Sequence, residues 1–279
     1  MKSTAPLYLP VDHLGIAARH LPPLLQAYTR LGFRVTRPDV LAARNAGGQL
    51  VELGQHSAHI IFADTYLELT AVPGPLRGHH LEHYLKRFNG LHILALKTCD
   101  AAASHARLRQ TPLPPLPLQR AARQVDYRIG DRGRAGEARF SWFQLAPEAF
   151  PEGLVCYVQH HTRDIVFQSA VMDHPNGAVG LAGCNIITST PQAARERFEP
   201  LAGADGGELP VGFLSGCDHG GSLTAPDPSL FEMGFAVKDL EHTAQLLSDA
   251  RVDCSRHGNR LWVPADSAGG CAVWFECAF

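Results

Sequence analysis

The sequence predicts an α+β fold in which four βαβββ modules pair into two curved-sheet barrels. A short apolar segment of strand type, followed by an amphipathic helical segment, occurs four times along the chain. The four strand segments are 13–19, 92–98, 183–189 and 232–238. A length of 279 residues gives each unit about 70 residues, which is too few to bury a face of its own sheet. We therefore expect the units to pair, in agreement with the two domains that this length favours.

Two domains follow from pairing consecutive modules. Residues 1–162 hold the first two modules and form the predicted N-terminal barrel, and residues 180–279 form the predicted C-terminal barrel. The connection between them contains His174-Pro-Asn-Gly177, a sequence typical of turns. The third module has the weakest strand pattern, because residues 202–228 are rich in Gly, Asp and Pro.

Local signals mark the helix of each module. The predicted helices are 21–31, 100–110, 191–201 and 239–250. Gly32 is suited to ending the first helix, Pro191 to the first turn of the third, and Asp239 to capping the fourth. The predicted later strands are 33–36, 60–62 and 66–72 in module 1, 125–129, 138–145 and 154–160 in module 2, and 261–263 and 271–277 in module 4.

The composition excludes several classes of protein. Apolar residues make up 45% of the chain and charged residues 19%, which is typical of a folded globular protein. A net charge of −2 argues against a nucleic-acid partner. The seven cysteines are scattered without a CxxC pair, so neither a disulfide framework nor a structural zinc site is expected. Because no signal peptide or membrane-spanning apolar run is present, we expect a soluble, cytoplasmic protein with no membrane partner.

Four short motifs carry a resemblance to a known superfamily. They are VDHLGIA at 11–17, YLEL at 66–69, GLHILAL at 90–96 and YVQH at 157–160. With their order and spacing, the chain resembles the vicinal oxygen chelate superfamily, which includes glyoxalase I, extradiol dioxygenases and fosfomycin-resistance proteins. Within that superfamily it is most similar to bacterial glyoxalase-like domain proteins.

The resemblance implies a metal site built from two paired modules. One ligand comes from the first strand and one from the last strand of each module, which gives His13 and Glu68, then His92 and Gln159. A slip of one residue would replace Gln159 with His160. His13, His92 and Glu68 alone form a group of two histidines and one carboxylate, which suits Fe(II) and also admits Mn, Co, Ni or Zn.

Strand alternation supports the same choice of residues. Residues two apart point to one face of a strand, and His13 and His92 take the same place in equivalent strands when the two motifs are aligned. Glu68 lies within an otherwise apolar strand. Because an unpaired carboxylate facing a core is costly, Glu68 needs a partner or a metal.

Most of the other histidines carry no such signal. His79, His80 and His83 follow helical spacing and are interpreted as a solvated helix face. In the second pair of modules the equivalent ligand positions hold Gly183 or Cys184, Glu232 and Glu276, with no histidine. We therefore expect a degenerate C-terminal barrel, which differs from the extradiol dioxygenases because those keep their metal in the second barrel.

The predicted function is that of a metal-dependent lyase or isomerase. The ion would act as a Lewis acid on a small substrate with two neighbouring oxygens, and the resemblance suggests that Glu68 moves a proton. The alternatives are an extradiol-type ring-cleaving dioxygenase and a metal-free protein that binds a small ligand. The basic segment 113–136 is a candidate for an anion contact, and Arg128 is the residue chosen from it. The partner is a small-molecule substrate, and a homodimer is left open.

Overall fold

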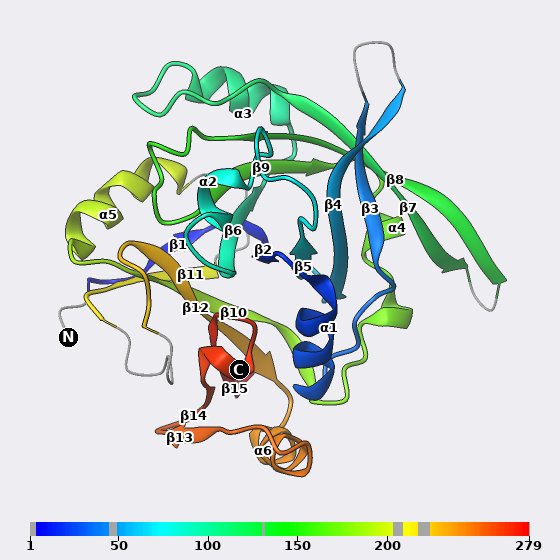
Figure 1. The fold of residues 1–279 in the computed structure, drawn as a ribbon, viewed down its shortest axis with the longest axis vertical. Coiled ribbons are helices and arrows are strands. Elements are labelled where there is room, and N and C mark those ends of the chain that lie inside the picture. Colours follow the sequence, from blue (N-terminus) through cyan, green and yellow to red (C-terminus); the bar gives the residue numbers. More distant parts are fainter. Residues whose placement is uncertain (1–3, 45–48, 130–131, 203–208, 217–223, 279) are drawn as a thin grey trace.

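A computed structural model describes residues 4–44, 49–129, 132–202, 209–216 and 224–278. Its strands form one closed barrel and one open sheet. In Figure 1 the barrel strands β3, β4, β7 and β8 occupy the upper part of the molecule, and β10, β12 and β15 lie below them.

The first two modules form the barrel. Module 1 consists of β2 (Val11–Ala18), α1 (Leu21–Arg30), β3 (Asp39–Arg44), β4 (Leu50–Ile61) and β5 (Tyr66–Ala71). Module 2 consists of β6 (Gly90–Lys97), α3 (Ala101–Leu108), β7 (Gln119–Ile129), β8 (Arg132–Gln144) and β9 (Leu154–His160). The short helix α2 (Glu82–Leu85) connects them. Both modules therefore have the predicted βαβββ order, although the strand expected at 33–36 begins instead at Asp39.

The two modules close the barrel through two antiparallel contacts. The strand order is β2-β5-β4-β3-β7-β8-β9-β6, with β2 paired to β6 and β3 paired to β7. In the first contact His13 lies opposite Ala95 and Gly15 lies opposite Ile93. A local two-fold axis through this contact relates module 1 to module 2. Under it, Ile93 takes the place of His13, and Ala95 takes the place of Gly15.

The C-terminal half is an open sheet, so the prediction of a second barrel was wrong. The sheet has seven strands in the order β1-β11-β10-β12-β15-β14-β13. Its elements are β1 (Leu7–Leu9), β10 (Ala178–Ile187), α5 (Pro191–Phe198), β11 (Leu209–Leu214), β12 (Ser229–Val237), α6 (Leu240–Asp249), β13 (Ser255–His257), β14 (Arg260–Val263) and β15 (Ala272–Cys277). Module 4 keeps the full βαβββ order. In the described part of module 3, only β11 follows the helix, and too few strands are present to close a second barrel.

The N-terminal strand crosses the predicted domain boundary. β1 pairs antiparallel with β11 of the open sheet, so residues 7–9 lie in the C-terminal sheet although they precede the barrel in sequence. The connection between the halves holds α4 (Arg163–Val166) and the 3-10 turn Ser169–Val171, and further 3-10 turns occupy Glu199–Leu201 and Ala265–Ser267.

The predicted helix signals act as expected. Gly32 has a φ of 82° just after α1, a conformation that glycine adopts without strain. Pro191 occupies the first turn of α5, and the Asp239 side chain accepts hydrogen bonds from the backbone N–H groups of Glu241 and His242 at the start of α6. These signals are local, and they were therefore readable from the sequence.

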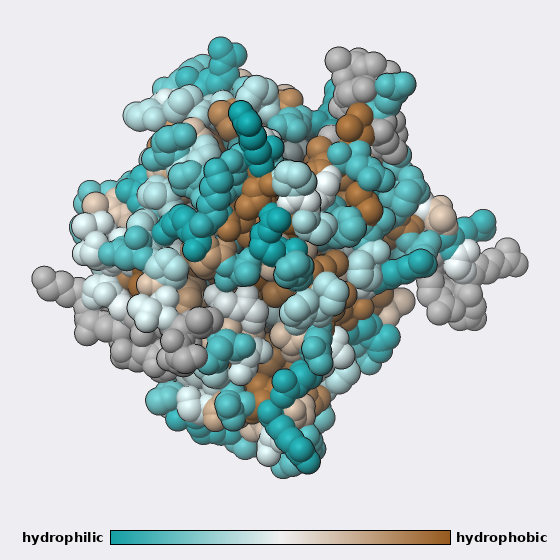
Figure 2. Space-filling view, in the orientation of Figure 1, coloured by the Kyte–Doolittle hydropathy of each residue, from teal (hydrophilic) through white to brown (hydrophobic). Residues whose placement is uncertain are grey.

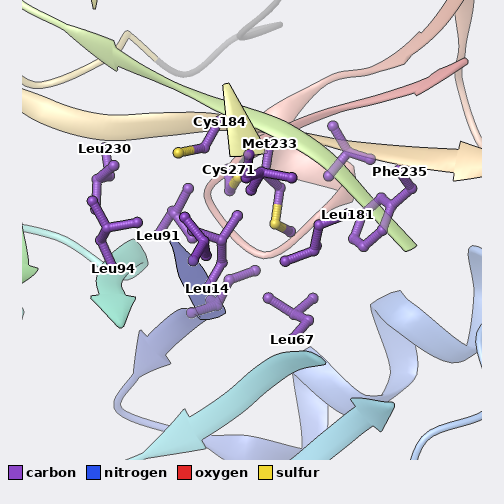
Figure 3. Packing of buried hydrophobic residues seen from close by; sticks show 14 of the residues in the cluster. Leu14, Leu67, Leu91, Leu94, Leu181, Cys184, Leu230, Met233, Phe235 and Cys271 are labelled. Atoms are coloured by element: carbon purple, nitrogen blue, oxygen red, sulfur yellow. The ribbon is translucent and has the colours of Figure 1, made fainter. Parts of the chain in front are cut away.

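One hydrophobic core joins the barrel to the open sheet. Side chains on the outer face of β2, β5 and β6 pack against the facing side of β10 and β12 (Figure 3). The labelled side chains are Leu14, Leu67, Leu91 and Leu94 from the barrel and Leu181, Cys184, Leu230, Met233, Phe235 and Cys271 from the C-terminal half. Every residue of β2 is buried, because one face looks into the barrel and the other into this shared core.

The surface seen in Figure 2 is mainly hydrophilic, and the hydrophobic residues in the middle of this face are surrounded by hydrophilic ones. In the described part of the chain, no helix is long and apolar enough to cross a membrane.

Candidate active site

A cavity of about 90 Å³ lies inside the barrel, which is several times the space that one water molecule needs. A small organic molecule therefore fits. Its polar lining consists of His13, Gln55, His59, Tyr66, Glu68, His80 and Arg123. Its apolar lining consists of Leu41, Ile93, Ala121, Phe140, Trp142, Leu154, Cys156 and Val158.

His13 and Glu68, two of the residues that the sequence analysis named, lie together in the lining of this cavity. β2 and β5 are parallel neighbours that place Gly15 opposite Glu68, and the side chains of His13 and Glu68 project from the same face. His13 Nε2 lies 3.8 Å from Glu68 Oε2, too far for a hydrogen bond. His13 and Glu68 are both buried. Their two polar atoms therefore flank a space in which an atom of a ligand can lie.

Asp12 orients the His13 ring through a hydrogen bond to Nδ1, the ring nitrogen that does not face Glu68. His13 Nδ1 donates to Asp12 Oδ1 at 2.8 Å, and His160 Nε2 donates to the same oxygen at 3.0 Å. Burial of Asp12 would raise its pKa, but the charges and hydrogen bonds of His160 and His13 outweigh burial and hold the pKa well below its ordinary value. Asp12 is therefore a carboxylate at any ordinary pH, and it accepts hydrogen bonds from both histidine rings.

Three neighbours hold the two reactive side chains in place. The Glu68 Oε1 atom accepts hydrogen bonds from Ser57 Oγ at 2.8 Å and from Gln55 Nε2 at 3.1 Å. The Tyr66 ring stacks on His13 with 4.3 Å between the ring centroids. These contacts use Glu68 Oε1 and one face of His13, so Oε2 of Glu68 and Nε2 of His13 are directed toward each other.

His92 and Gln159 are not brought to this cavity. His92 is fully buried in another contact, where its Nε2 donates to the Phe88 carbonyl oxygen at 2.8 Å. Gln159 accepts a hydrogen bond from the Ala101 N–H at 3.1 Å and donates to the Cys99 carbonyl oxygen at 2.6 Å, so it caps the start of α3. The alternative residue His160 does reach the site, but through Asp12.

A register shift of one residue explains where His92 lies. The ladder between β2 and β6 pairs Gly15 with Ile93 and Ile16 with Leu91, so His92 falls at an irregularity between them. The two-fold relation therefore makes Ile93 of β6 the equivalent of His13 of β2. Gly15 pairs with Glu68 in β5 and its equivalent Ala95 pairs with Cys156 in β9, so Cys156 is the equivalent of Glu68. A one-residue slip moves a side chain to the opposite face of a strand.

The sequence did not single out several residues of the site. His59 is buried on β4 opposite Glu68, and its Nδ1 has no hydrogen-bond partner in the described structure. Burial lowers the pKa of His59 well below its ordinary value, and the nearby charges of Arg123, His13 and His160 lower it further. The alternation of Gln55, Ser57 and His59 in β4 was a usable signal, but the strand was expected to begin only at residue 60.

His80 also lines the cavity and does not belong to a solvated helix face. Its ring lies 5.7 Å from the Trp142 ring, and burial lowers its pKa to about 3. It lies just before α2. The helical spacing of His79, His80 and His83 was therefore misleading, because only a short turn of helix forms there.

The remaining predicted positions lie elsewhere. Arg128 is in β7 opposite Gly133, and its side chain is outside the described residues. In the open sheet, Glu232 accepts a hydrogen bond from Asn185 at 2.6 Å, and Glu276 pairs with Arg260 at 2.6 Å. Both carboxylates thus have protein partners.

The donor set does not fit the metal that the resemblance implies. A catalytic metal is usually held by three protein ligands, and among the described residues no third His, Cys, Asp or Glu side chain is arranged with His13 and Glu68 to hold one. The equivalent positions of module 2 hold Ile93, which has no donor, and Cys156, whose buried thiol has a pKa far above its ordinary value. In the described part of the chain, no group of three or more His, Cys, Asp or Glu side chains is arranged to hold a metal ion.

The buried position of His92 predicts a loss of stability in mild acid. Burial lowers its pKa from 6.5 to about 4. The unfolded chain therefore binds a proton between these values that the folded chain does not. The stability from neutral His92 is present above pH 6.5 and is lost as the pH falls toward 4, by about 1.4 kcal/mol per pH unit for one such group.

Urea unfolding between pH 7 and pH 4.5 measures this effect. We expect His92→Gln to have a shallower dependence of unfolding free energy on pH than the unmodified protein. His20→Gln is the matched control, because His20 is exposed. An unchanged slope in His92→Gln would contradict the assignment.

Comparison with known proteins agrees with the fold. Residues 11–202 match the model of the glyoxalase-like domain. The chain belongs to the glyoxalase-like domain family. This confirms the resemblance to the vicinal oxygen chelate superfamily that the four motifs indicated.

Solved structures with the same fold have low sequence identity. A hypothetical protein from Staphylococcus aureus has a TM-score of 0.59 at 8% identity, over 96% of this chain and 99% of that chain. A mutant of 4-hydroxymandelate synthase from Streptomyces coelicolor has a TM-score of 0.58 at 10% identity, over 99% of this chain and 95% of that chain. A fusion of a xylose isomerase-like TIM barrel with 4-hydroxyphenylpyruvate dioxygenase has a TM-score of 0.56 at 12% identity, over 99% of this chain and 50% of that chain. The search of curated proteins gave no match.

Proposed function

We propose that this glyoxalase-like protein is an isomerase or lyase that moves a proton between neighbouring atoms of a small oxygen-bearing substrate. The observation that carries the proposal is the pairing of His13 Nε2 with Glu68 Oε2 across 3.8 Å in a small, largely apolar cavity. Each of the two groups is fixed by its own hydrogen bonds. An acid and a base held in this way can act on one substrate without rearranging.

The separation of the two groups favours a reaction on one face of the substrate. Reacting atoms approach to about 3–3.5 Å, so groups on opposite faces of a planar substrate would stand roughly 6–7 Å apart. The 3.8 Å between His13 and Glu68 is much shorter than this. An acid and a base this close can reach a C–H group and the oxygen of its neighbouring carbonyl from the same side.

The two residues then have complementary roles. Glu68 Oε2 removes the proton from the carbon, while His13, held by Asp12 through Nδ1, donates a proton from Nε2 to the carbonyl oxygen. The product of this step is an enediol or enol. In an enediol, return of a proton to the former carbonyl carbon and loss of the proton from the other hydroxyl complete an isomerisation. In an enol, re-formation of the carbonyl with loss of a leaving group from the carbon on the far side of the deprotonated one completes an elimination.

Exchange of carbon-bound hydrogen with solvent tests the proposal. Small 2-oxo acids and 2-hydroxy ketones, with 2-oxohexanoate among them, are incubated with the protein in D₂O and followed by NMR. We expect deuterium to enter at the carbon next to the carbonyl faster than in buffer for part of this panel. If the compounds bind and none of them exchanges, the protein is a binding protein of the same fold and the proposal is wrong.

The same assay separates this chemistry from a metal-dependent reaction. Because the described residues hold no group of three ligands arranged for a metal ion, we expect protein treated with a chelator to keep its full exchange rate. Loss of exchange after chelation, with recovery on addition of Fe(II), Mn(II), Ni(II), Co(II) or Zn(II), would favour the Lewis-acid hypothesis. Oxygen uptake with catechols would favour the dioxygenase hypothesis, which needs a third iron ligand.

A further inference from the structure

Arg123 is a cation in the wall of the barrel that the proposed proton transfer does not use. Its partly buried side chain projects from β7 and lines the inner cavity. It also lines a second cavity of about 530 Å³, whose lining includes Ile61, Val125 and Val166. Arg123 therefore lies where the two cavities approach each other.

The guanidinium group of Arg123 makes no direct hydrogen bond or ion pair with a side chain of the described residues. Its nearest aromatic contact is the Phe140 ring, 6.0 Å from Cζ to the ring centroid. Tyr66, Glu68 and Asp39 lie close enough to influence its charge. Of these, Glu68 is already hydrogen-bonded to Gln55 and Ser57 through Oε1, and Asp39 accepts from the Val40 N–H.

An arginine remains charged in a protein, and leaving it partly buried without an anion is costly. Burial does lower the pKa of Arg123, but not enough to remove the charge. The flat guanidinium presents parallel N–H donors that match a carboxylate. The cavity also has an apolar part of its lining, which includes Ile93, Trp142 and Leu154.

We propose that Arg123 binds a carboxylate of the substrate, so that the substrate is a small carboxylic acid with an apolar body. The carboxylate lies against Arg123, the apolar body lies against Ile93, Trp142 and Leu154, and the reacting carbon lies between His13 and Glu68. This inference rests on the proposed function for the position of the reacting carbon. The preference for a carboxylate stands on Arg123 alone and can be measured without any reaction.

Calorimetric binding of a matched pair of ligands tests the preference. The probes are 2-oxohexanoate and 2-oxohexanamide, which have the same shape and differ in charge. We expect the protein to bind the acid at least about tenfold more tightly than the amide, as a hydrogen-bonded charge pair usually provides. Arg123→Met should remove this preference, and Arg123→Lys should keep part of it.

Two controls keep the result interpretable. Arg120→Met removes the same charge from an exposed position on the same strand, and it should keep the preference. Glu68→Gln should also keep it although exchange is lost, which separates carboxylate binding from proton transfer. Equal binding of acid and amide by the unmodified protein, or a preference that survives in Arg123→Met, would overturn the inference. If Arg123→Met does not fold, loss of the preference in Arg123→Gln supports the inference, and its retention overturns it.

Discussion

Glu68→Gln is expected to lower the rate of deuterium exchange by about 10²- to 10⁴-fold, the usual contribution of a positioned acid or base. The amide has nearly the same shape as the carboxylate and can still accept hydrogen bonds from Gln55 and Ser57, so the barrel should fold normally. It cannot take up a proton at the required position. The measurement is the exchange rate of 2-oxohexanoate by NMR, together with the melting temperature of the variant.

A surface carboxylate provides the control for this variant. Glu196 is exposed on α5, so Glu196→Gln removes the same charge far from the cavity and should leave the exchange rate unchanged. The assignment of Glu68 as the base fails if Glu68→Gln folds, binds 2-oxohexanoate and exchanges its hydrogen at the normal rate.

Asp12→Asn should have the second-largest effect, although Asp12 does not touch the substrate. Its carboxylate accepts the hydrogen bond from His13 Nδ1 and so fixes the orientation of the ring, and loss of such a carboxylate costs up to about 10⁴-fold in a comparable arrangement. Asparagine fills the same space but cannot accept both histidine hydrogen bonds in the same way. We expect kcat to fall strongly and KM to change little.

A spectroscopic readout separates this positioning role from a general loss of structure. In the unmodified protein, ¹⁵N NMR of His13 should show a proton fixed on Nδ1, and in Asp12→Asn the signal should indicate a mixture of ring forms. Asp64→Asn is the control, because Asp64 is an exposed carboxylate that pairs with Arg163 on the surface. A normal kcat in a folded Asp12→Asn protein would rule out the positioning role.

Much of the N-terminal half could be predicted because its signals are local. The order of strand and helix in modules 1 and 2, the end of α1 at Gly32 and the capping of α6 by Asp239 all depend on residues close together in sequence. Glu68 was found for a similar reason, since a carboxylate within an apolar strand requires a partner wherever the strand lies. The closed barrel follows from pairing two such modules.

Other features depend on contacts between distant segments. The second barrel was expected because modules 3 and 4 repeat the starting pattern, yet closure needs edge strands that the described part of module 3 does not supply. The pairing of β1 with the C-terminal sheet also cannot be predicted from a local sequence pattern. It is an antiparallel pairing across about 200 residues of chain, between Leu7 and Val211.

The sequence by itself determined the modules, the family and the pair His13 and Glu68, because strand periodicity and a buried carboxylate are properties of short segments. Only the tertiary structure decided which residues complete the site. The irregularity at His92 turns that side chain toward Phe88 and leaves Ile93 and Cys156 in the cavity. Side chains alternate with a period of two, so a shift of one residue in a ladder exchanges the two faces, and the ladder is set by the partner strand. For the same reason Arg123 and His59 face the cavity only once β7 and β4 have taken their places in the barrel.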